Sequence, residues 1–176
     1  ALETRSIGGL HGEAGIVPTA RRPGSARAPK WSRARAKVTN MAHIVVLGAG
    51  LGGMPMAYEM RELARRDDKV TVVSNGPRFH FVPSNPWVAV NWRTRQDIEL
   101  DLGSALKRKG IDFVPVGAAR VHPAENRIEL DDGNSIAYDH LVIATGPKLA
   151  FDEVPGLGPA ASGGHTQSVC HVDHAV

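Results

Sequence analysis

Three glycines with a fixed spacing are the first residues in this sequence whose types and positions point to a chemical role. Gly48, Gly50 and Gly53 form the pattern G-x-G-x-x-G directly after the apolar run His43–Leu47. In this pattern the first glycine makes a tight turn, the second lets the backbone approach a pyrophosphate, and the third allows a helix to pack closely. The positive N-terminal end of the following helix favours phosphate further. The pattern predicts a dinucleotide site rather than an ordinary glycine-rich turn. The predicted contacts are Gly48, Gly50, Leu51, Gly52 and Gly53.

The end of the next apolar run, which starts at Val70, departs from the usual dinucleotide fingerprint. A carboxylate about 20 residues after the glycines normally holds the ribose hydroxyls, whereas this run ends in Ser74 and Asn75. Both side chains can hydrogen-bond a ribose or an adenine without a charge, which makes them candidate ligands and weakens the case for NAD. The alternative is that they only open a turn, because both residue types suit turns.

The elements that must position these residues alternate between strand and helix, which predicts an α/β fold with a parallel core. An antiparallel β-meander is expected before the last strand, because three short strands occur there in hairpin spacing. Residues 75–92 are expected to be irregular, since three prolines interrupt them. The expected strands are 43–47, 70–74, 113–116, 119–122, 127–130, 135–138 and a fully buried strand at 141–144, and the expected helices are 54–66 and 101–109.

Composition limits the class of protein and separates the chain into two parts. The single cysteine excludes an internal disulfide, and no apolar run reaches the roughly 18 to 20 residues of a membrane span. Residues 1–40 carry 8 Lys and Arg and only two acidic residues, whereas 41–176 carry 13 Lys and Arg against 16 Asp and Glu. We expect 1–40 to be a disordered tail and 41–176 to be the folded part. The tail is interpreted as upstream or non-native sequence before Met41, as a transit peptide, or as a basic arm for lipid or nucleic acid.

A second small-residue turn, Ala144-Thr145-Gly146, follows the expected strand 141–144. A strand that runs into this turn after a meander resembles the second flavin motif of flavoproteins with two dinucleotide-binding domains. This superfamily includes the disulfide reductases and the membrane-associated quinone reductases. The resemblance implies a Rossmann-like FAD-binding domain, with Ala144, Thr145 and Gly146 passing close to FAD.

Five segments together resemble the sulfide:quinone oxidoreductases more specifically, and they lie between Met41 and the last residue. The resemblance implies that the chain is the N-terminal part of such an enzyme, with an FAD-binding domain incomplete at its C-terminal end. The segments are 41–50 (MAHIVVLGAG), 52–55 (GGMP), 81–87 (FVPSNPW), 144–151 (ATGPKLAF) and 167–174 (QSVCHVDH).

The family resemblance implies an activity and assigns roles to residues. Sulfide would attack a protein disulfide beside the flavin, FAD would take two electrons, a membrane quinone would receive them, and sulfur would leave as polysulfide. Cys170 matches the first of three functional cysteines in the family, and His174 matches a histidine that handles protons. The absence of the other two cysteines implies that this fragment alone is inactive. The resemblance also places the adenosine near Ser74, Asn75 and Ala118, and the flavin near Pro83, Thr145 and Gly146.

The expected setting of the full-length protein follows from the same resemblance. It is a peripheral protein of the bacterial inner membrane, whereas the fragment itself is expected to be soluble. The resemblance leaves open whether the protein forms a homo-oligomer. No nucleic acid partner is expected, and no metal site is predicted. The alternatives are a type II NADH:quinone reductase, a flavocytochrome sulfide dehydrogenase, or a dinucleotide-binding module without catalysis.

Overall fold

The structure is a computed structural model that describes residues 41–176. The basic stretch 1–40, with its predicted disorder, lies outside the described residues. None of the helices in the described part has the length and apolar character needed to cross a lipid bilayer.

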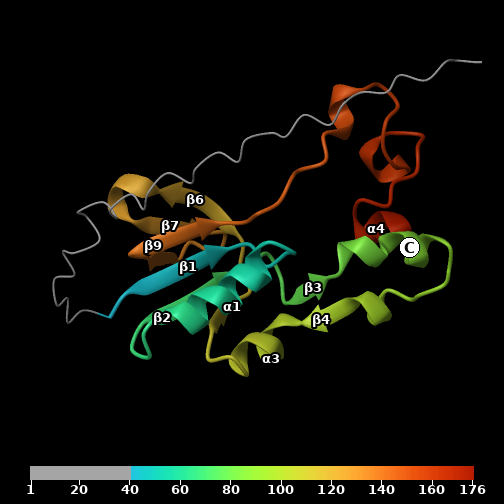
Figure 1. The fold of residues 1–176 in the computed structure, drawn as a ribbon. Coiled ribbons are helices and arrows are strands. Elements are labelled where there is room, and N and C mark those ends of the chain that lie inside the picture. Colours follow the sequence, from blue (N-terminus) through green and yellow to red (C-terminus); the bar gives the residue numbers. More distant parts are fainter. Residues whose placement is uncertain (1–40) are drawn as a thin grey trace, which may run out of the picture. The chain divides into compact units, whose positions relative to one another are not determined.

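A four-stranded parallel sheet forms the centre of the described part (Figure 1). Its strands, in spatial order, are β5 (Asp112–Val114), β2 (Lys69–Val73), β1 (His43–Leu47) and β9 (His140–Ile143). Helix α1 (Gly53–Leu63) connects β1 to β2, and α3 (Leu102–Lys107) precedes β5. Val46 pairs with Val72 on one side and with Val142 on the other, so the carboxyl ends of the three strands lie at one edge. This arrangement confirms the predicted strand–helix–strand unit and parallel core.

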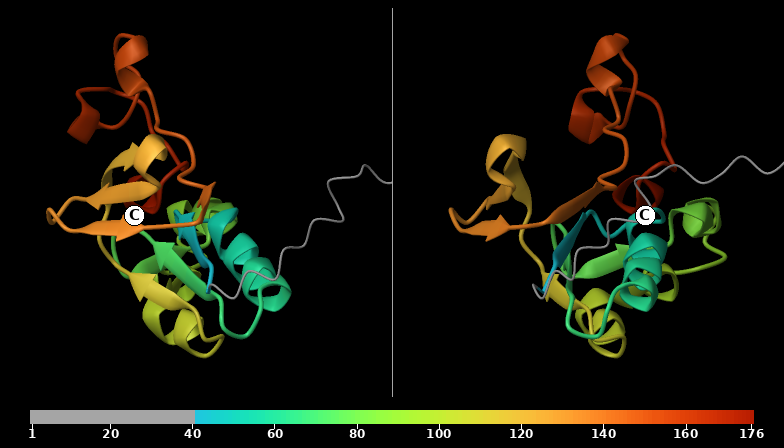
Figure 2. Two further views of the ribbon diagram at one scale, coloured as in Figure 1. Left: turned by 90° about the vertical axis from the view of Figure 1, so that its left-hand side faces the viewer. Right: turned by 60° about the vertical axis from the view of Figure 1, so that its left-hand side comes forward.

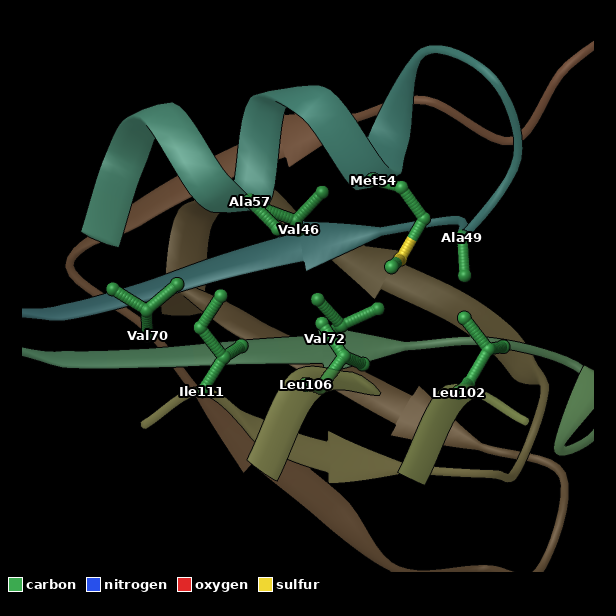
Figure 3. Close-up of a cluster of buried hydrophobic side chains, with 9 residues drawn as sticks. All are labelled: Val46, Ala49, Met54, Ala57, Val70, Val72, Leu102, Leu106 and Ile111. Atoms are coloured by element: carbon green, nitrogen blue, oxygen red, sulfur yellow. The ribbon is translucent and has the colours of Figure 1, made fainter. Parts of the chain in front are cut away.

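The two faces of the sheet carry separate apolar cores, because successive side chains of a strand point to opposite faces. On one face, α1 and α3 cover Val46, Val70 and Val72, as Figure 3 shows. On the other face, Val45 packs in a cluster with Ile128. That second cover is the predicted antiparallel meander, and Figure 2 shows α1 and this meander on opposite sides of β1. Its strands are β6 (Ala118–His122), β7 (Arg127–Leu130) and β8 (Ser135–Ala137).

The core against α3 leads to a stability prediction. Leu106 is fully buried in the cluster between α3 and the sheet. We expect Leu106→Ala to lower the free energy of unfolding by about 2–5 kcal/mol, because it removes buried methyl groups and leaves a cavity. Leu63→Ala is the matched control, since Leu63 is 76% exposed at the end of α1. Urea denaturation measures both variants, and equal losses would contradict the assignment of this core.

The structure corrects two expectations. Residues 75–92 are not irregular throughout: β3 (Arg78–His80) pairs antiparallel with β4 (Glu99–Asp101), and α2 (Asn85–Ala89) follows a short 3-10 turn. The partner of β3 lies about twenty residues away, so local sequence did not reveal the pairing. The expected fully buried strand at 141–144 is also wrong, because β9 is an edge strand of the sheet and Ile143 is 63% exposed.

The C-terminal residues return to the middle of the chain. Helix α4 (Val172–Ala175) packs on α2 through a small apolar cluster that joins Val172 and Ala175 to Val88 and Ile98. The buried Asn85 side chain donates a hydrogen bond to the carbonyl oxygen of Val169 at 2.9 Å. These contacts fix the segment that contains the only cysteine against α2.

Candidate functional site at the carboxyl edge of the sheet

A cavity of about 540 Å³ lies at the carboxyl edge of the parallel sheet. Ligands of open α/β sheets bind at this edge, where strands end and loops begin. Residues from distant parts of the sequence meet around it: the ends of β1 and β2, β3, the start of β6, the end of β9 and the residues before α4. The lining residues are Leu47, Gly48, Ala49, Gly50, Val73, Ser74, Asn75, Arg78, His80, Val82, Gly117, Ala118, Asp131, Ala144, Thr145, His171 and Val172.

The glycine turn forms one wall, and two of its glycines are required by close backbone contacts. Gly48 has φ +104°, and its N–H donates to the carbonyl oxygen of Val73 at 2.8 Å. A Cβ on Gly53 would lie 1.8 Å from the carbonyl oxygen of Gly48. Gly50 differs from both, because a Cβ there would meet no atom within 4 Å. Gly48 therefore turns the chain, Gly53 packs against that turn, and Gly50 leaves open space at the wall.

The second small-residue turn lies directly against the first. A Cβ on Gly48 would be 2.3 Å from the carbonyl oxygen of Ala144. The Ala144 N–H donates a hydrogen bond to the carbonyl oxygen of Leu47 at 2.7 Å. Thr145 lines the cavity and Gly146 has φ +74°. The pairing of β9 with β1 thus brings the two motifs, which are about 95 residues apart in the sequence, to one wall of the cavity.

The end of β2 and the start of β6 form a further part of the wall. The Ser74 N–H donates to the carbonyl oxygen of Val114 at 3.1 Å, which holds Ser74 beside β5. Asn75, Gly117 and Ala118 line the cavity next to it. The three residues that the resemblance placed near an adenosine, Ser74, Asn75 and Ala118, are therefore neighbours in the structure.

Cys170 and His174 lie beside the cavity rather than in its wall. The cysteine is exposed, and its N–H donates to Ser168 Oγ at 3.2 Å. The next two residues, His171 and Val172, line the cavity. His174 has its ring 5.6 Å from that of His171 and 5.5 Å from Phe151, and its buried Nδ1 has no hydrogen-bond partner among the described residues.

The structure thus divides the predicted site residues. Gly48, Gly50, Ser74, Asn75, Ala118, Ala144 and Thr145 line the cavity. The remaining predicted residues flank it without being part of its wall. They are Leu51, Gly52, Gly53, Pro83, Gly146, Cys170 and His174.

Four polar residues in the wall were missed by the sequence reasoning. Arg78 and His80 reach the cavity through the pairing of β3 with β4, and His171 arrives through the packing of α4 on α2. Asp131 comes from the turn after β7. No local pattern marks the first three, because contacts between distant segments place them. The sequence did contain a signal for Asp131: the usual carboxylate is missing after β2, so an acidic residue from another loop could take its place.

The histidines at the cavity belong to a chain of charges. His80 Nδ1 lies 3.2 Å from Glu99 Oε1, an ion-pair distance without hydrogen-bond geometry. Arg95 pairs with both Glu99 and Asp173, and Asp173 Oδ2 lies 3.3 Å from His171 Nδ1. The hydrogen bond from Arg95 holds the pKa of Asp173 below its usual range. These contacts tie the segment around α4 to β4.

The sequence matches the family of pyridine nucleotide-disulphide oxidoreductases over residues 42–176. The chain belongs to this family. Family membership confirms the predicted Rossmann-like fold and FAD as the cofactor. Within residues 41–176, no group of three or more His, Cys, Asp or Glu side chains is arranged to hold a metal ion.

Relatives of this chain include proteins named for sulfide oxidation. A sulfide-quinone reductase of Aquifex aeolicus is 38% identical over 134 residues, which cover 76% of this chain and 30% of the relative. A mitochondrial sulfide:quinone oxidoreductase of Dictyostelium discoideum is 30% identical over 128 residues, 69% of this chain and 26% of the relative. The solved structure of the Aquifex aeolicus enzyme superposes with a TM-score of 0.67 and covers 76% of this chain and 30% of that one. NDH2 of Plasmodium falciparum is 21% identical and superposes with a TM-score of 0.61 over 77% of this chain and 27% of that one. It shares the fold. The chain thus spans 26% to 30% of the length of these relatives.

The residues around the glycine turn fit an FAD. The N–H groups of Leu51 and Gly52 have no hydrogen-bond partner within residues 41–176, and α1 directs its N-terminal end at the same turn. Free amides at a helix N-terminus suit a pyrophosphate. The open space at Gly50 leaves room for the backbone to approach it. Both features are expected of a cradle for the phosphates of a dinucleotide.

Two partly buried histidines predict how the stability of the protein depends on pH. Burial is the main cause that lowers the pKa of His43 and of His80 in the folded chain, although Glu99 opposes it at His80. The unfolded state therefore binds more protons at these residues, and stability falls as the pH drops from about 7 towards 5. His80→Gln should reduce this loss, as measured by urea unfolding at several pH values. A His80→Gln variant that loses as much stability as the wild type would contradict this assignment.

Proposed function

We propose that this chain provides the FAD-binding part of a sulfide:quinone oxidoreductase. One observation carries the proposal: the two small-residue turns and the segment of the only cysteine surround a single cavity at the carboxyl edge of the sheet. The names of the relatives that are 38% and 30% identical over the matched residues support sulfide as the substrate and quinone as the acceptor. In this proposal the full-length protein works at the surface of a membrane, and its quinone is dissolved in the lipid of that membrane.

The binding part of the proposal assigns each wall of the cavity to one part of FAD. The glycine turn 48–53 takes the pyrophosphate, and Ser74, Asn75 and the backbone of Ala118 take the adenosine. The flavin lies towards Pro83 and Thr145–Gly146. When bound, FAD supplies the capacity to accept two electrons from a sulfur donor and to pass them on to a quinone.

The chemical part of the proposal assigns the sulfur step to Cys170. Its thiol is exposed, so that a small sulfur species can reach it, and the thiolate is the reactive form in exchange with sulfur compounds. His174 lies four residues further on, in α4, and we assign to it the proton handling that the family resemblance implies. A disulfide needs a second thiol, which this sequence does not contain. We therefore propose that the chain by itself binds FAD without turning over sulfide.

An anaerobic experiment with the purified 176-residue chain tests the proposal. After incubation with FAD and removal of free cofactor, the protein should retain flavin absorbance. With sulfide and a soluble ubiquinone analogue, it should reduce the quinone no faster than the same concentration of free FAD. Loss of all flavin would contradict the cofactor site. Quinone reduction well above the free-FAD rate would contradict the need for a second thiol.

A further inference from the structure

The side chain of Asp131 is exposed and belongs to the wall of the cavity, together with Gly117 and Ala118. Asp131 follows β7, and its N–H donates to the carbonyl oxygen of Gly117 at 2.9 Å, which anchors it to the start of β6. Its side chain lies over Gly117, because a Cβ at that glycine would be 2.1 Å from Asp131 Oδ2. The same Cβ would be 3.6 Å from the Cβ of Asn75. Within residues 41–176 the Asp131 carboxylate makes no hydrogen bond or ion pair.

The neighbouring Asp132 shows that this freedom is specific to one position. Asp132 Oδ1 accepts from the Asn134 N–H at 3.0 Å, and its Oδ2 accepts from Asn134 Nδ2 at 2.8 Å. Asp132 thus stabilises the turn between β7 and β8, which explains its type. Asp131 takes no part in the turn through its side chain, and it lines the cavity whereas Asp132 does not. The turn alone therefore does not account for an acidic residue at 131.

The chemistry of the surrounding wall defines what such a carboxylate can bind. The two residues that follow β2, Ser74 and Asn75, are uncharged. A carboxylate at this place usually holds the ribose hydroxyls of a dinucleotide. A carboxylate accepts hydrogen bonds from two hydroxyls at once and binds them more strongly than an uncharged acceptor does. We propose that Asp131, from the turn after β7, holds the ribose hydroxyls of the FAD adenosine. This inference rests on the FAD site proposed above and adds the residue that determines its affinity for the ribose.

Gly117 is part of the same arrangement. Any side chain at 117 would occupy the place of the Asp131 carboxylate, because the clash at 2.1 Å is with the oxygen itself. Gly117 is buried and has a φ outside the left-handed region, so its backbone tolerates an alanine and the carboxylate is the group that must give way. Gly117→Ala therefore displaces the carboxylate while Asp131 itself is kept.

Equilibrium titration of the 176-residue chain with FAD tests the proposal. Asp131→Ala should weaken FAD binding by about tenfold or more, the effect of losing hydrogen bonds to a charged group, and Gly117→Ala should weaken it in the same direction. Asp132→Asn is the matched control, because an asparagine oxygen keeps the turn, and it should bind FAD as the wild type does. An FAD analogue whose adenosine ribose lacks both hydroxyls completes the design. It should bind more weakly than FAD to the wild type and equally to wild type and Asp131→Ala.

The outcomes separate this inference from the proposed function. If the wild type binds FAD and Asp131→Ala binds it equally well, the ribose assignment is wrong and the FAD site stands. If Asp131→Ala weakens FAD and the analogue by the same factor, the carboxylate acts on another part of the molecule and the inference is likewise overturned. If the wild type retains no FAD, the proposed cofactor site fails, and this inference with it.

Discussion

Gly53→Ala is expected to destabilise the protein by about 3 kcal/mol or more in the free energy of unfolding. The added Cβ would lie 1.8 Å from the carbonyl oxygen of Gly48 and 2.7 Å from its carbonyl carbon. Both are backbone atoms, so α1 would have to move away from β1. That movement would open the core into which α1 places Met54 and Ala57. Urea denaturation followed by circular dichroism measures the loss.

Gly52→Ala is the control for this substitution. Gly52 has φ −88°, and its added Cβ would meet no atom within 4 Å. The variant should therefore unfold within about 1 kcal/mol of the wild type. If both alanine variants unfolded at the same urea concentration, the close approach of α1 to the glycine turn would not determine stability.

Gly50→Val is expected to have the opposite profile: a stable fold and FAD binding weakened by about a hundredfold or more. Gly50 lies outside the left-handed region, and an added Cβ would meet nothing within 4 Å. The protein therefore has room for the side chain. The same space is where the proposed pyrophosphate approaches the backbone, so the valine and the cofactor compete for it.

Fluorescence titration with FAD, together with thermal unfolding, separates the two effects. Gly103→Ala is the matched control, because Gly103 lies in α3 and its added Cβ would be at an ordinary 3.6 Å from Asp101 Oδ1. It should leave FAD affinity unchanged. A stable Gly50→Val variant that binds FAD as tightly as the wild type would mean that the phosphates do not lie at this turn.

Patterns within short segments of sequence predicted the parallel core and one wall of the cavity. Val46 and Val72 lie in continuous apolar runs that only a sheet covered on both faces can bury, and the glycines follow such a run directly. The other residues of the cavity wall are placed by pairing and packing between segments that are distant in the sequence. His80 reaches the cavity because β3 pairs with β4, and His171 because α4 packs on α2. No periodicity or spacing around either histidine encodes those contacts.

The exposure of Ile143 shows a further limit of sequence patterns. The run 140–143 is as apolar as those of β1 and β2, but a strand at the edge of a sheet has one neighbour instead of two. Hydrophobicity predicts that a strand forms, whereas its burial depends on what lies beside it. Strand order, which sequence alone does not give, decides that.

The place of β1 between β2 and β9 also determines when the sheet can form during synthesis. Among the strands of residues 41–176, β1 is the first to leave the ribosome and β9 is the last. Until residues 140–143 emerge, one backbone edge of β1 stays unpaired, and the contact between Gly48 and Ala144 cannot form. Contacts of such long sequence separation slow folding and prolong the exposure of apolar strands. Translation of β9 therefore pairs this edge of β1 and brings Ala144 and Thr145 to the cavity wall, and before that step the exposed apolar strands favour binding of a chaperone.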